Sequence, residues 1–455
     1  MMARPTRTRR DFLRWAGLGA AAYAFGLGPS VAQPPGRRPN VIVILTDDQG
    51  SIDINCFGAT DLHTPNLDAL AARGTRFAQF YSGAPICSPS RAALLTGRCP
   101  QRAELPTNAH GDTGMPGRQM TIAEMLRAAG YRTGIFGKWH LGEADDQTPL
   151  AQGFDEFFGH KLGCIDNYSH FFYWSGPNRH DLWRDNQEIW EEGAYFPGLV
   201  VREAHRFLEE NRDTPFFMYL PFNVPHYPMQ GEAEYRAQYA GTEEPRKAYA
   251  AFVSTLDEKI GDVIRKVDAL GLRENTLIIV MSDNGHSVEE RANFGGGRTG
   301  PYRGHKFTLW EGGIRLPCIA SWPGIVPEGE VRGQMVASMD WLPTIAHYCG
   351  VAAPDRLLDG RSIAEVIASA DAASPHESLC WQSDKQWAVR EGDWKLVVNG
   401  PASIQDGSEI PAQEVFLSNL ADNPGESNNL AAEKPEIVER LTRIHENWAI
   451  DVQRQ

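Results

Sequence analysis

The sequence predicts an α/β fold: a large, mostly parallel mixed sheet flanked by helices, followed by a smaller C-terminal subdomain with a short antiparallel sheet. Short runs of apolar, often β-branched residues recur along the chain, as in strands buried on both faces. Helical segments separate these runs, which favours parallel strands joined by helical crossovers. Beyond residue 370, short strand-like segments follow one another without intervening helices, which is typical of an antiparallel sheet.

The first strand and the first helix of the fold are predicted between residues 41 and 74. The run Val41–Leu45 is continuously apolar and β-branched at four of its five positions, which predicts a buried strand. Thr64 is a suitable N-cap residue and Pro65 suits the first helical turn. We therefore expect a helix from Asn66 to Arg73, with Gly74 as its C-terminal stop.

The next helices and strands are predicted by caps and by periodicity. Thr121 and Glu124 form a capping-box pattern that opens a helix ending at Gly130, and Tyr131–Phe136 reads as the following strand. Two further strands are predicted at Phe216–Leu220 and Leu277–Met281. Between them lies a long helix, closed by Gly271, with these apolar residues on a helical period: Val253, Leu256, Ile260, Val263, Ile264, Val267 and Leu270.

A stretch of small residues, Ala370 to Ser374, marks the predicted boundary between the main domain, residues 33–370, and the C-terminal subdomain, residues 371–455. Three short strands are expected in this subdomain, at Leu379–Gln382, Gln386–Val389 and Trp394–Val398. A terminal helix is predicted from Pro435 to Trp448.

Residues 1–32 are interpreted as an export signal. Four arginines near the start precede an uncharged stretch, Trp15–Leu27, which is too short to span a bilayer. Ser30 and Ala32 offer a cleavage site before Gln33. The run Thr8-Arg9-Arg10-Asp11-Phe12-Leu13-Arg14 looks like a twin-arginine signal, which a receptor reads. We therefore expect the twin-arginine translocase as a partner and a periplasmic or secreted protein; a retained N-terminal anchor is the alternative.

The charge of the chain limits its partners. The formal net charge is −14, and removal of residues 1–32, which hold five Arg and one Asp, makes the remainder more acidic. Such a protein is not expected to bind nucleic acid, and an anionic substrate would need a local concentration of positive charge. The seven cysteines form no CxxC pair, so the spacing of a zinc site is absent, and their odd number leaves at least one outside any internal disulfide.

Polar residues follow two of the predicted strands directly. Asp47 and Asp48 come after the first strand, and Ser282-Asp283-Asn284-Gly285 follows the strand Leu277–Met281. Ligand sites of parallel sheets lie at the carboxyl ends of strands, where these residues are expected to meet. Three carboxylates and an amide oxygen are suitable ligands for one Ca²⁺, or for Mg²⁺. A solvated turn is the alternative interpretation of each pair taken alone.

Cys87 stands at the start of a third predicted helix, with Pro89 in its first turn and Gly97 at its end. At a helix N-terminus the helix dipole favours anions, so we expect the pKa of this thiol to be lowered. The alternative is an ordinary buried cysteine that precedes a helix.

The segment around Cys87 resembles the recognition sequence of type I sulfatases, which are members of the alkaline phosphatase superfamily. It reads Cys87-Ser88-Pro89-Ser90-Arg91, followed by Ala92-Ala93-Leu94-Leu95-Thr96-Gly97-Arg98. The resemblance implies an alkaline phosphatase-like fold, with residues 33–370 as the catalytic domain. It also implies that Cys87 is oxidised to formylglycine, with a formylglycine-generating enzyme as a partner during maturation. Further segments similar to sulfatases are Gly137–Gly142, Gly153–Asp155, Asn223–His226, Ser282–Gly285 and Lys306–Pro317.

The resemblance implies roles for each site residue. Asp47, Asp48, Asp283 and Asn284 would hold the metal together with residue 87. Lys138 and Lys306 would clamp the sulfate, and His226 or Lys306 would protonate the departing oxygen. The hydrated formylglycine would attack sulfur with one hydroxyl, and His140 would take the proton of the second, which lets the sulfate leave. Arg91 would hold the hydrated aldehyde. These cations also supply the local positive charge that an acidic protein needs for an anionic transition state.

The implied reaction is hydrolysis of a sulfate monoester, either an aryl sulfate or, as we favour, a carbohydrate sulfate. Thr107-Asn108-Ala109-His110 is similar to a segment of N-acetylgalactosamine-6-sulfatase and arylsulfatase A-like members, which favours a sugar. The segment from Cys164 to Trp190 is rich in rings that belong either to a sugar-binding cleft or to a packed loop. Two rival interpretations remain: a phosphodiester or phosphonate monoester hydrolase of the same superfamily, and a non-catalytic relative that binds sulfated glycans.

Overall fold

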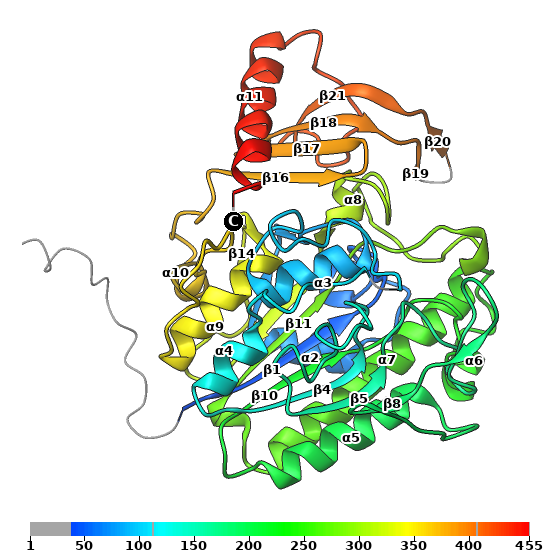
Figure 1. Cartoon of the computed structure of the whole chain (residues 1–455). Helices are drawn as coiled ribbons and strands as arrows, with labels where there is room; N and C mark the ends of the chain where they lie inside the picture. Colours follow the sequence, from blue (N-terminus) through cyan, green and yellow to red (C-terminus); the bar gives the residue numbers. More distant parts are fainter. Residues whose placement is uncertain (1–37, 112, 406–407, 455) are drawn as a thin grey trace, which may run out of the picture. The chain divides into compact units, whose positions relative to one another are not determined.

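A mixed sheet of ten strands forms the centre of the structure (Figure 1). In spatial order the strands are β14 (Glu330–Arg332), β2 (Thr75–Phe77), β13 (Cys318–Ser321), β11 (Thr276–Ser282), β1 (Asn40–Thr46), β10 (Phe216–Pro221), β4 (Arg132–Lys138), β5 (Glu156–His160), β8 (Trp183–Arg184) and β9 (Gln187–Glu188). The computed structural model describes residues 38–111, 113–405 and 408–454, and the predicted export signal lies outside these described residues.

The five central strands, from β11 to β5, run parallel, and β13 and β8 pair antiparallel at either side of them. Helices cover both faces of this sheet. One face carries α2 (Pro65–Ala72), α5 (Phe196–Glu210) and α7 (Arg246–Ala269); the other carries α3 (Cys87–Thr96), α4 (Ile122–Ala128), α9 (Trp341–Cys349) and α10 (Ala364–Ala368). The predicted α/β fold with a mostly parallel mixed sheet is therefore confirmed.

Strand β1 shows why this sheet needs helices on both of its faces. Val41, Val43 and Leu45 pack into the cluster beneath α3, α4 and α9, whereas Ile42 and Ile44 pack against α2, α5 and α7. All seven residues of β1 are buried, because alternate side chains of a strand point to opposite faces. A continuous apolar run is what such a strand requires.

The two predicted helix caps had different outcomes. At α4 the capping box is confirmed: the Glu124 N–H donates to the Thr121 hydroxyl at 3.1 Å, and the Thr121 N–H donates to the Glu124 carboxylate at 2.9 Å. Thr64 occupies the predicted N-cap position of α2, with Pro65 in the first turn, but its hydroxyl makes no cap hydrogen bond and accepts from the Asn55 N–H at 3.0 Å instead. The Asp257 carboxylate of α7 accepts the first N–H groups of α2, at 2.8 and 3.0 Å. A distant residue thus replaces the local cap.

The C-terminal part forms a separate antiparallel sheet with the order β16 (Ser378–Ser383), β17 (Gln386–Glu391), β18 (Trp394–Gly400) and β21 (Gln413–Asn419), on which α11 (Pro435–Asp451) packs. The three predicted strands and the terminal helix are present, and β21 was not predicted. The boundary near residue 370 stays a prediction.

Lys395 of β18 is fully buried and pairs with Glu311 at 2.8 Å and Glu426 at 3.0 Å. Glu311 begins the short helix α8 (Glu311–Ile314), so buried charges join this sheet to the segment after Lys306.

The remaining elements are short or peripheral. They are β3 (Phe80–Tyr81), β6 (Phe171–Phe172), β7 (Arg179–His180), α6 (Ala233–Gln238), β12 (Arg315–Leu316), β15 (Val336–Ala337), β19 (Ser403–Gln405) and β20 (Ser408–Ile410). Within the described residues, no helix is both long and apolar enough to cross a membrane.

Candidate active site

The carboxyl ends of four parallel strands bring the predicted site residues together. Asp47 and Asp48 follow β1, and Asp283 and Asn284 follow the neighbouring β11, whose Ser282 pairs with Thr46. Lys138 ends β4, with His140 two residues beyond, and His226 follows β10. Cys87 and Arg91 reach the same place from α3. These positions follow from the rule that parallel sheets build sites at the carboxyl ends of their strands.

The oxygen-rich side chains form a group that fits a hard divalent cation. The Asp48 N–H donates to Asp283 Oδ1 at 3.2 Å, so the Asp283 carboxylate lies against the backbone of Asp48. Asn284 Nδ2 donates to Asp48 Oδ1 at 2.6 Å, while the buried Asn284 Oδ1 has no hydrogen-bond partner among the described residues. A buried oxygen without a donor is costly unless a cation or water satisfies it. The orphaned oxygen and the adjacent carboxylates are therefore suited to Ca²⁺ or Mg²⁺.

Two overlapping groups of side chains in this cluster lie close enough together to hold a metal ion. Ligand atoms of Asp47, Cys87 and Asp283 lie within 4.8 Å of one another, and so do those of Asp47, Asp48 and His226. The backbone at Asp48 is left-handed, with φ of 62°, a conformation that costs energy in a residue with a side chain. The strained backbone thus lies at Asp48, whose carboxylate is one of these candidate ligands.

Permanent cations surround these carboxylates. Lys138 Nζ lies 2.6 Å from Asp47 Oδ2, and Lys306 Nζ lies 2.8 Å from Asp48 Oδ2. Burial raises the pKa of Asp47, but Lys138 and the other positive groups outweigh it and hold the pKa well below its usual range. Burial, together with the charge of Asp47, raises the pKa of Asp283 to about 6. Burial opposes the charged form of Lys306, yet Asp48 outweighs it and raises the pKa of the lysine.

Arg91 is fully buried and fixes the geometry around Asp283. Its guanidinium donates to Asp283 Oδ2 at 2.8 and 3.1 Å and to the Lys138 backbone oxygen at 3.0 Å. A guanidinium presents these donors in a rigid plane, which a lysine could not copy. Arg91 therefore contacts Asp283, which is one of the predicted metal ligands, and the backbone of β4. It lies 3.6 Å from Asp47 Oδ1 as well.

Cys87 lies at the first position of α3, and its side chain is only 1% exposed. Its Sγ is 3.6 Å from Asp47 Oδ1. The expectation of a lowered thiol pKa is wrong: burial raises the pKa of Cys87 well above its usual value, and Lys138 and Lys306 offset this only in part. Desolvation of a thiolate thus outweighs the helix dipole. The unmodified side chain is a neutral thiol at physiological pH.

His140 is held as a neutral imidazole beside Cys87. Burial and the charges of Lys138 and Arg91 lower the pKa of His140 well below its usual value. A side chain on Gly163 would meet the ring of His140 at 2.8 Å, so the absence of a Cβ there gives the ring its place. The backbone of His140 is left-handed, with φ of 55°.

His226 faces the carboxylates with one ring nitrogen. Its Nδ1 lies 2.7 Å from the Tyr227 carbonyl oxygen, which can only accept, so Nδ1 carries the proton. Nε2 lies 3.7 Å from Asp48 Oδ2. A lone pair facing a carboxylate is stable only with a proton or a cation between them. This ring is placed to bind a cation or to hold a proton near the site.

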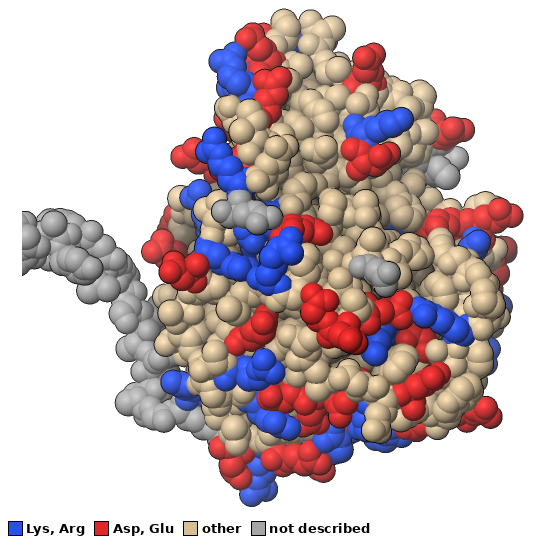
Figure 2. Space-filling model, viewed as in Figure 1, with Lys and Arg blue, Asp and Glu red and all other residues tan. Residues whose placement is uncertain are grey.

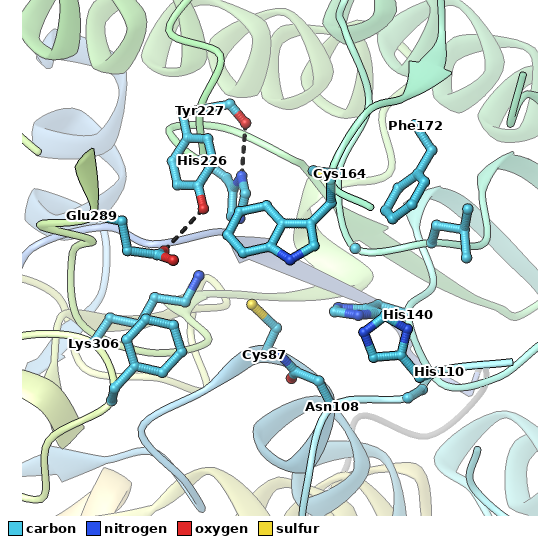
Figure 3. Close-up of a pocket in the computed structure, with 15 residues that line it drawn as sticks. Cys87, Asn108, His110, His140, Cys164, Phe172, His226, Tyr227, Glu289 and Lys306 are labelled. Carbon is cyan, nitrogen blue, oxygen red and sulfur yellow. Dashed lines mark hydrogen bonds between the residues drawn. The ribbon is translucent and has the colours of Figure 1, made fainter. Parts of the chain in front are cut away.

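The pocket above Cys87 is lined by both polar groups and rings (Figure 3). Lys306 and His140 enter from opposite sides of the Cys87 sulfur, as Figure 3 shows. The lining residues are Cys87, Asn108, Ala109, His110, His140, Leu162, Gly163, Cys164, Phe172, Trp174, His226, Tyr227, Glu289, Lys306 and Phe307. The pocket thus combines a charged floor with partly aromatic walls, a composition suited to an anionic group on an organic ring.

The rings of the segment from Cys164 to Trp190 fall into two groups: some line the pocket, and others pack within the loop. Phe172 and Trp174 line the pocket, and Trp174 stacks on Tyr227 with ring centres 5.8 Å apart. Trp183 instead packs under Lys161, and Trp190 stacks on His180 away from the pocket lining. The similar segment Thr107–His110 is placed at the pocket by Asn108, which accepts from the Ser88 N–H at 3.1 Å.

Glu289 was not predicted from the sequence. Its Oε2 accepts hydrogen bonds from the Tyr227 hydroxyl and the Ser287 hydroxyl, both at 2.9 Å, which hold the carboxylate at the pocket wall. No ion pair involves it within the described chain, although the other acidic groups of the site are paired. The sequence offers no signal for this role, because Glu289 lies in a loop without a motif.

The charges of the site are distinct from those of the surface. Arg91 and Lys138 are fully buried, and Lys306 is 3% exposed. Figure 2 shows acidic and basic side chains intermingled over much of the viewed face. Three of the cations predicted to serve an anionic substrate are therefore buried at the site, where each contacts an aspartate.

Comparisons with known proteins agree with this geometry. The family model described as Sulfatase matches residues 39–351. Human arylsulfatase A is 33% identical to the chain, covering 92% of this chain and 89% of that protein. N-acetylgalactosamine-6-sulfatase of Canis lupus familiaris is 34% identical, covering 92% and 86%. The crystal structure of Ps i-CgsB in complex with k-i-k-neocarrahexaose has a TM-score of 0.79 at 28% identity, covering 90% of this chain and 93% of that one.

Proposed function

Because the chain belongs to the sulfatase family of sulfuric ester hydrolases, we propose that it cleaves a carbohydrate sulfate monoester with a formylglycine at position 87 and one bound divalent cation. The observation that carries this proposal is the convergence of Cys87, three aspartates, Asn284 and two lysines on one pocket floor. Sulfate transfer needs a nucleophile and fixed positive charge around the sulfate oxygens, and this floor offers both.

The raised pKa of Cys87 supports a modified nucleophile. A neutral thiol is a poor nucleophile, so the unmodified residue is not suited to attack sulfur at neutral pH. As hydrated formylglycine, position 87 would supply two hydroxyl groups, one for attack on sulfur and one whose deprotonation releases the sulfate. The cysteine would thus serve as a precursor rather than as a catalyst.

Asp47, Asp48, Asp283 and Asn284 would hold the cation together with residue 87, and the orphaned Asn284 Oδ1 supports this assignment. A bound Ca²⁺ or Mg²⁺ would supply Lewis-acid polarisation and lower the pKa of a coordinated hydroxyl. Arg91 would keep Asp283 charged and correctly oriented through its two hydrogen bonds. We favour Ca²⁺ because it accepts many protein oxygens, whereas Mg²⁺ usually keeps several waters and binds only one or two carboxylates.

The cationic residues would stabilise the sulfate oxygens. Lys138 and Lys306 are charged and already directed at the pocket floor by Asp47 and Asp48. Such preorganised charges act strongly because they need no reorientation when negative charge develops. Lys306 Nζ and His226 Nε2 both face Asp48 Oδ2, at 2.8 and 3.7 Å, so either of these two residues would pass a proton to the departing alcohol oxygen.

His140 would act as the base that releases the product. Its imidazole is neutral, since burial and nearby cations lower its pKa, and its ring lies across Cys87 from Lys306 (Figure 3). A neutral imidazole can accept the proton of the second hydroxyl at position 87. Gly163 supports this role by leaving room for the ring.

A saccharide substrate is supported by the pocket walls and by one relative. Phe172, Trp174 and Tyr227 present rings at the pocket, and rings of this kind pack against sugar faces. Ps i-CgsB, which resembles the chain over most of its length, was crystallised with k-i-k-neocarrahexaose. An aryl sulfate would use the same walls as a smaller ligand.

The proposed reaction is tested by comparing turnover of three substrate classes by the purified enzyme. We expect kcat/KM to be highest for a sulfated saccharide, measurable for 4-nitrophenyl sulfate and lowest for an aryl phosphodiester. Release of sulfate would be followed by ion chromatography. A preference for the phosphodiester would instead identify a phosphodiester or phosphonate monoester hydrolase. Binding of sulfated glycans without turnover would identify a non-catalytic binding protein.

Glu289 is expected to disfavour a second anionic group on the substrate. Two like charges about 7 Å apart at a partly exposed site repel by roughly 2 kcal/mol, which is more than tenfold in kcat/KM. Glu289→Gln should therefore raise the kcat/KM ratio of a disulfated to a monosulfated monosaccharide about tenfold. Glu290→Gln, which changes the adjacent exposed residue, is the matched control. An unchanged ratio in Glu289→Gln would show that Glu289 does not face the substrate.

The cellular context follows from the predicted signal. We propose that the chain is exported by the twin-arginine translocase to the periplasm or beyond, after a formylglycine-generating enzyme has acted on Cys87 in the cytosol. All seven cysteines lie in the described residues and none is paired there. A fold without disulfides suits assembly in a reducing compartment.

A further inference from the structure

The segment that carries Lys306 is held on one side by the loop that follows β11. The Lys306 N–H donates to the His286 backbone oxygen at 3.0 Å, and the Gly285 N–H donates to the Gly313 oxygen at 3.0 Å. A Cβ on Gly285 would meet the Gly312 oxygen at 2.1 Å, so these backbones are in direct contact. This side fixes the two ends of the segment from 306 to 313.

On its other side, the segment that carries Lys306 is held by one side chain of the C-terminal sheet, that of Gln386. Gln386, the first residue of β17, donates from Nε2 to the Phe307 backbone oxygen at 2.5 Å. Its Oε1 accepts from the Leu309 N–H at 3.0 Å. The primary amide thus pairs with both a carbonyl and an N–H of the turn directly after Lys306, as a neighbouring strand would.

This turn contains a strained residue. Phe307 has φ of 71°, in the left-handed region that residues with a side chain occupy at a cost. Its side chain is 40% exposed, whereas Lys306 directly before it is 3% exposed with its Nζ on Asp48. The left-handed residue therefore separates an exposed ring at the pocket lining from a buried lysine whose Nζ lies on Asp48. Strain of this kind persists only where surrounding contacts fix the backbone.

We propose that Gln386 is a positioning residue, which holds the turn Phe307–Leu309 so that Lys306 reaches the pocket floor. This inference rests on the proposed function only for the catalytic role of Lys306. It assigns a part of the active-site architecture to the C-terminal sheet, outside the residues 39–351 that match the family model.

Gln386 is also the contact that best separates positioning from general stability. Other contacts between this sheet and the segment involve fully buried charges, such as Lys395 of β18 with Glu311 and Glu426. Removing one of those partners would leave a buried charge unpaired and destabilise the fold. Gln386 is half-buried, so water can replace its hydrogen bonds at little cost to folding.

The kinetic test uses the full-length enzyme and the variant Gln386→Leu. We expect kcat to fall about 10- to 100-fold with little change in the thermal unfolding midpoint, because a small displacement of a catalytic group is costly. Gln382→Leu, the same substitution on the adjacent strand β16, is the control and should retain the wild-type kcat. Gln386→Glu keeps the acceptor for Leu309 but loses the donor to Phe307, so its kcat should also fall.

A double-mutant cycle separates positioning from a diffuse structural effect. In the Lys306→Ala background, Gln386→Leu should lower kcat no further, since its effect acts through Lys306. Losses that multiply would overturn the proposal, and so would a wild-type kcat in folded Gln386→Leu.

A second readout does not depend on the reaction. The rate at which an amine-acylating reagent modifies Lys306, followed by peptide mass spectrometry, should rise roughly fivefold or more in Gln386→Leu, because a displaced turn opens more often to solvent. Lys138 in the same molecule should be unaffected. An unchanged Lys306 rate would contradict the positioning role. Lack of sulfatase activity in the wild-type enzyme, with the Lys306 rate still raised, would count against the proposed function and not against Gln386.

Discussion

Replacement of Cys87 by alanine is expected to lower sulfate-ester turnover by at least about 10⁴-fold, because the variant lacks any precursor of the nucleophile. The substitution removes a small buried side chain at the start of α3, so the fold should survive it. Turnover of a sulfated saccharide and the thermal unfolding midpoint would be measured together. Cys99→Ala, a buried cysteine just beyond the same helix, is the matched control and should remain active.

Cys87→Ser tests the nature of the nucleophile more closely. Serine offers one hydroxyl where hydrated formylglycine offers two, so the variant should transfer sulfate once and then stall. The expected result is a burst of at most one equivalent of alcohol, with a sulfated serine in the peptide that contains position 87, as detected by mass spectrometry. Full multiple turnover by Cys87→Ser would contradict the mechanism. An intact thiol at Cys87 in fully active wild-type enzyme would equally exclude the formylglycine.

Metal removal should have the second largest effect. Treatment with a chelator is expected to abolish turnover, and Ca²⁺ or Mg²⁺ should restore it, the more effective ion being the one the site prefers. The cation should also stabilise the folded chain, by about 2.7 kcal/mol at a concentration one hundred times its Kd. A rise in the unfolding midpoint on addition of the metal alone measures this stabilisation independently of activity.

Asn284→Leu should remove this metal-dependent stabilisation, because it eliminates the buried oxygen without a donor. Asn284→Asp retains an oxygen at the same place and should retain the stabilisation. Asn275→Leu, near the opposite end of β11, serves as the control for the substitution itself. If the midpoint of Asn284→Leu still rises with Ca²⁺ as in the wild type, the cation binds elsewhere.

The parts of the fold that were predicted correctly are those with a local physical cause. Val41–Leu45 reads as a strand because both faces of β1 are covered, and the Thr121–Glu124 box closes on itself within four residues. Thr64 was correctly predicted as the N-cap residue, but the Asp257 carboxylate of α7, not the Thr64 hydroxyl, accepts the first N–H groups of α2. No local pattern shows that a carboxylate 190 residues away will arrive there.

The site divides in the same way. Asp47, Asp283 and Lys138 could be expected to meet, since the strands that precede them share one edge of the sheet. The raised pKa of Cys87 could not be predicted from the sequence, because it depends on how completely α3 is buried and not on the position of the residue in the helix. Glu289 lies in a loop at the pocket wall, and Gln386 contacts the turn after Lys306 from a second sheet. Only the tertiary structure shows these two contacts.

The burial of α3 also determines when the proposed oxidation of Cys87 can occur relative to folding. Every residue of this helix is buried, and Cys87 is 1% exposed at its start. An enzyme that oxidises Cys87 must therefore act while the segment is still accessible, before the helix packs beneath the sheet. The translocase proposed for this chain, which carries folded proteins, would act after that moment. In the proposed sequence of maturation and export, a chain that folds before Cys87 is oxidised would leave the cytosol without its nucleophile.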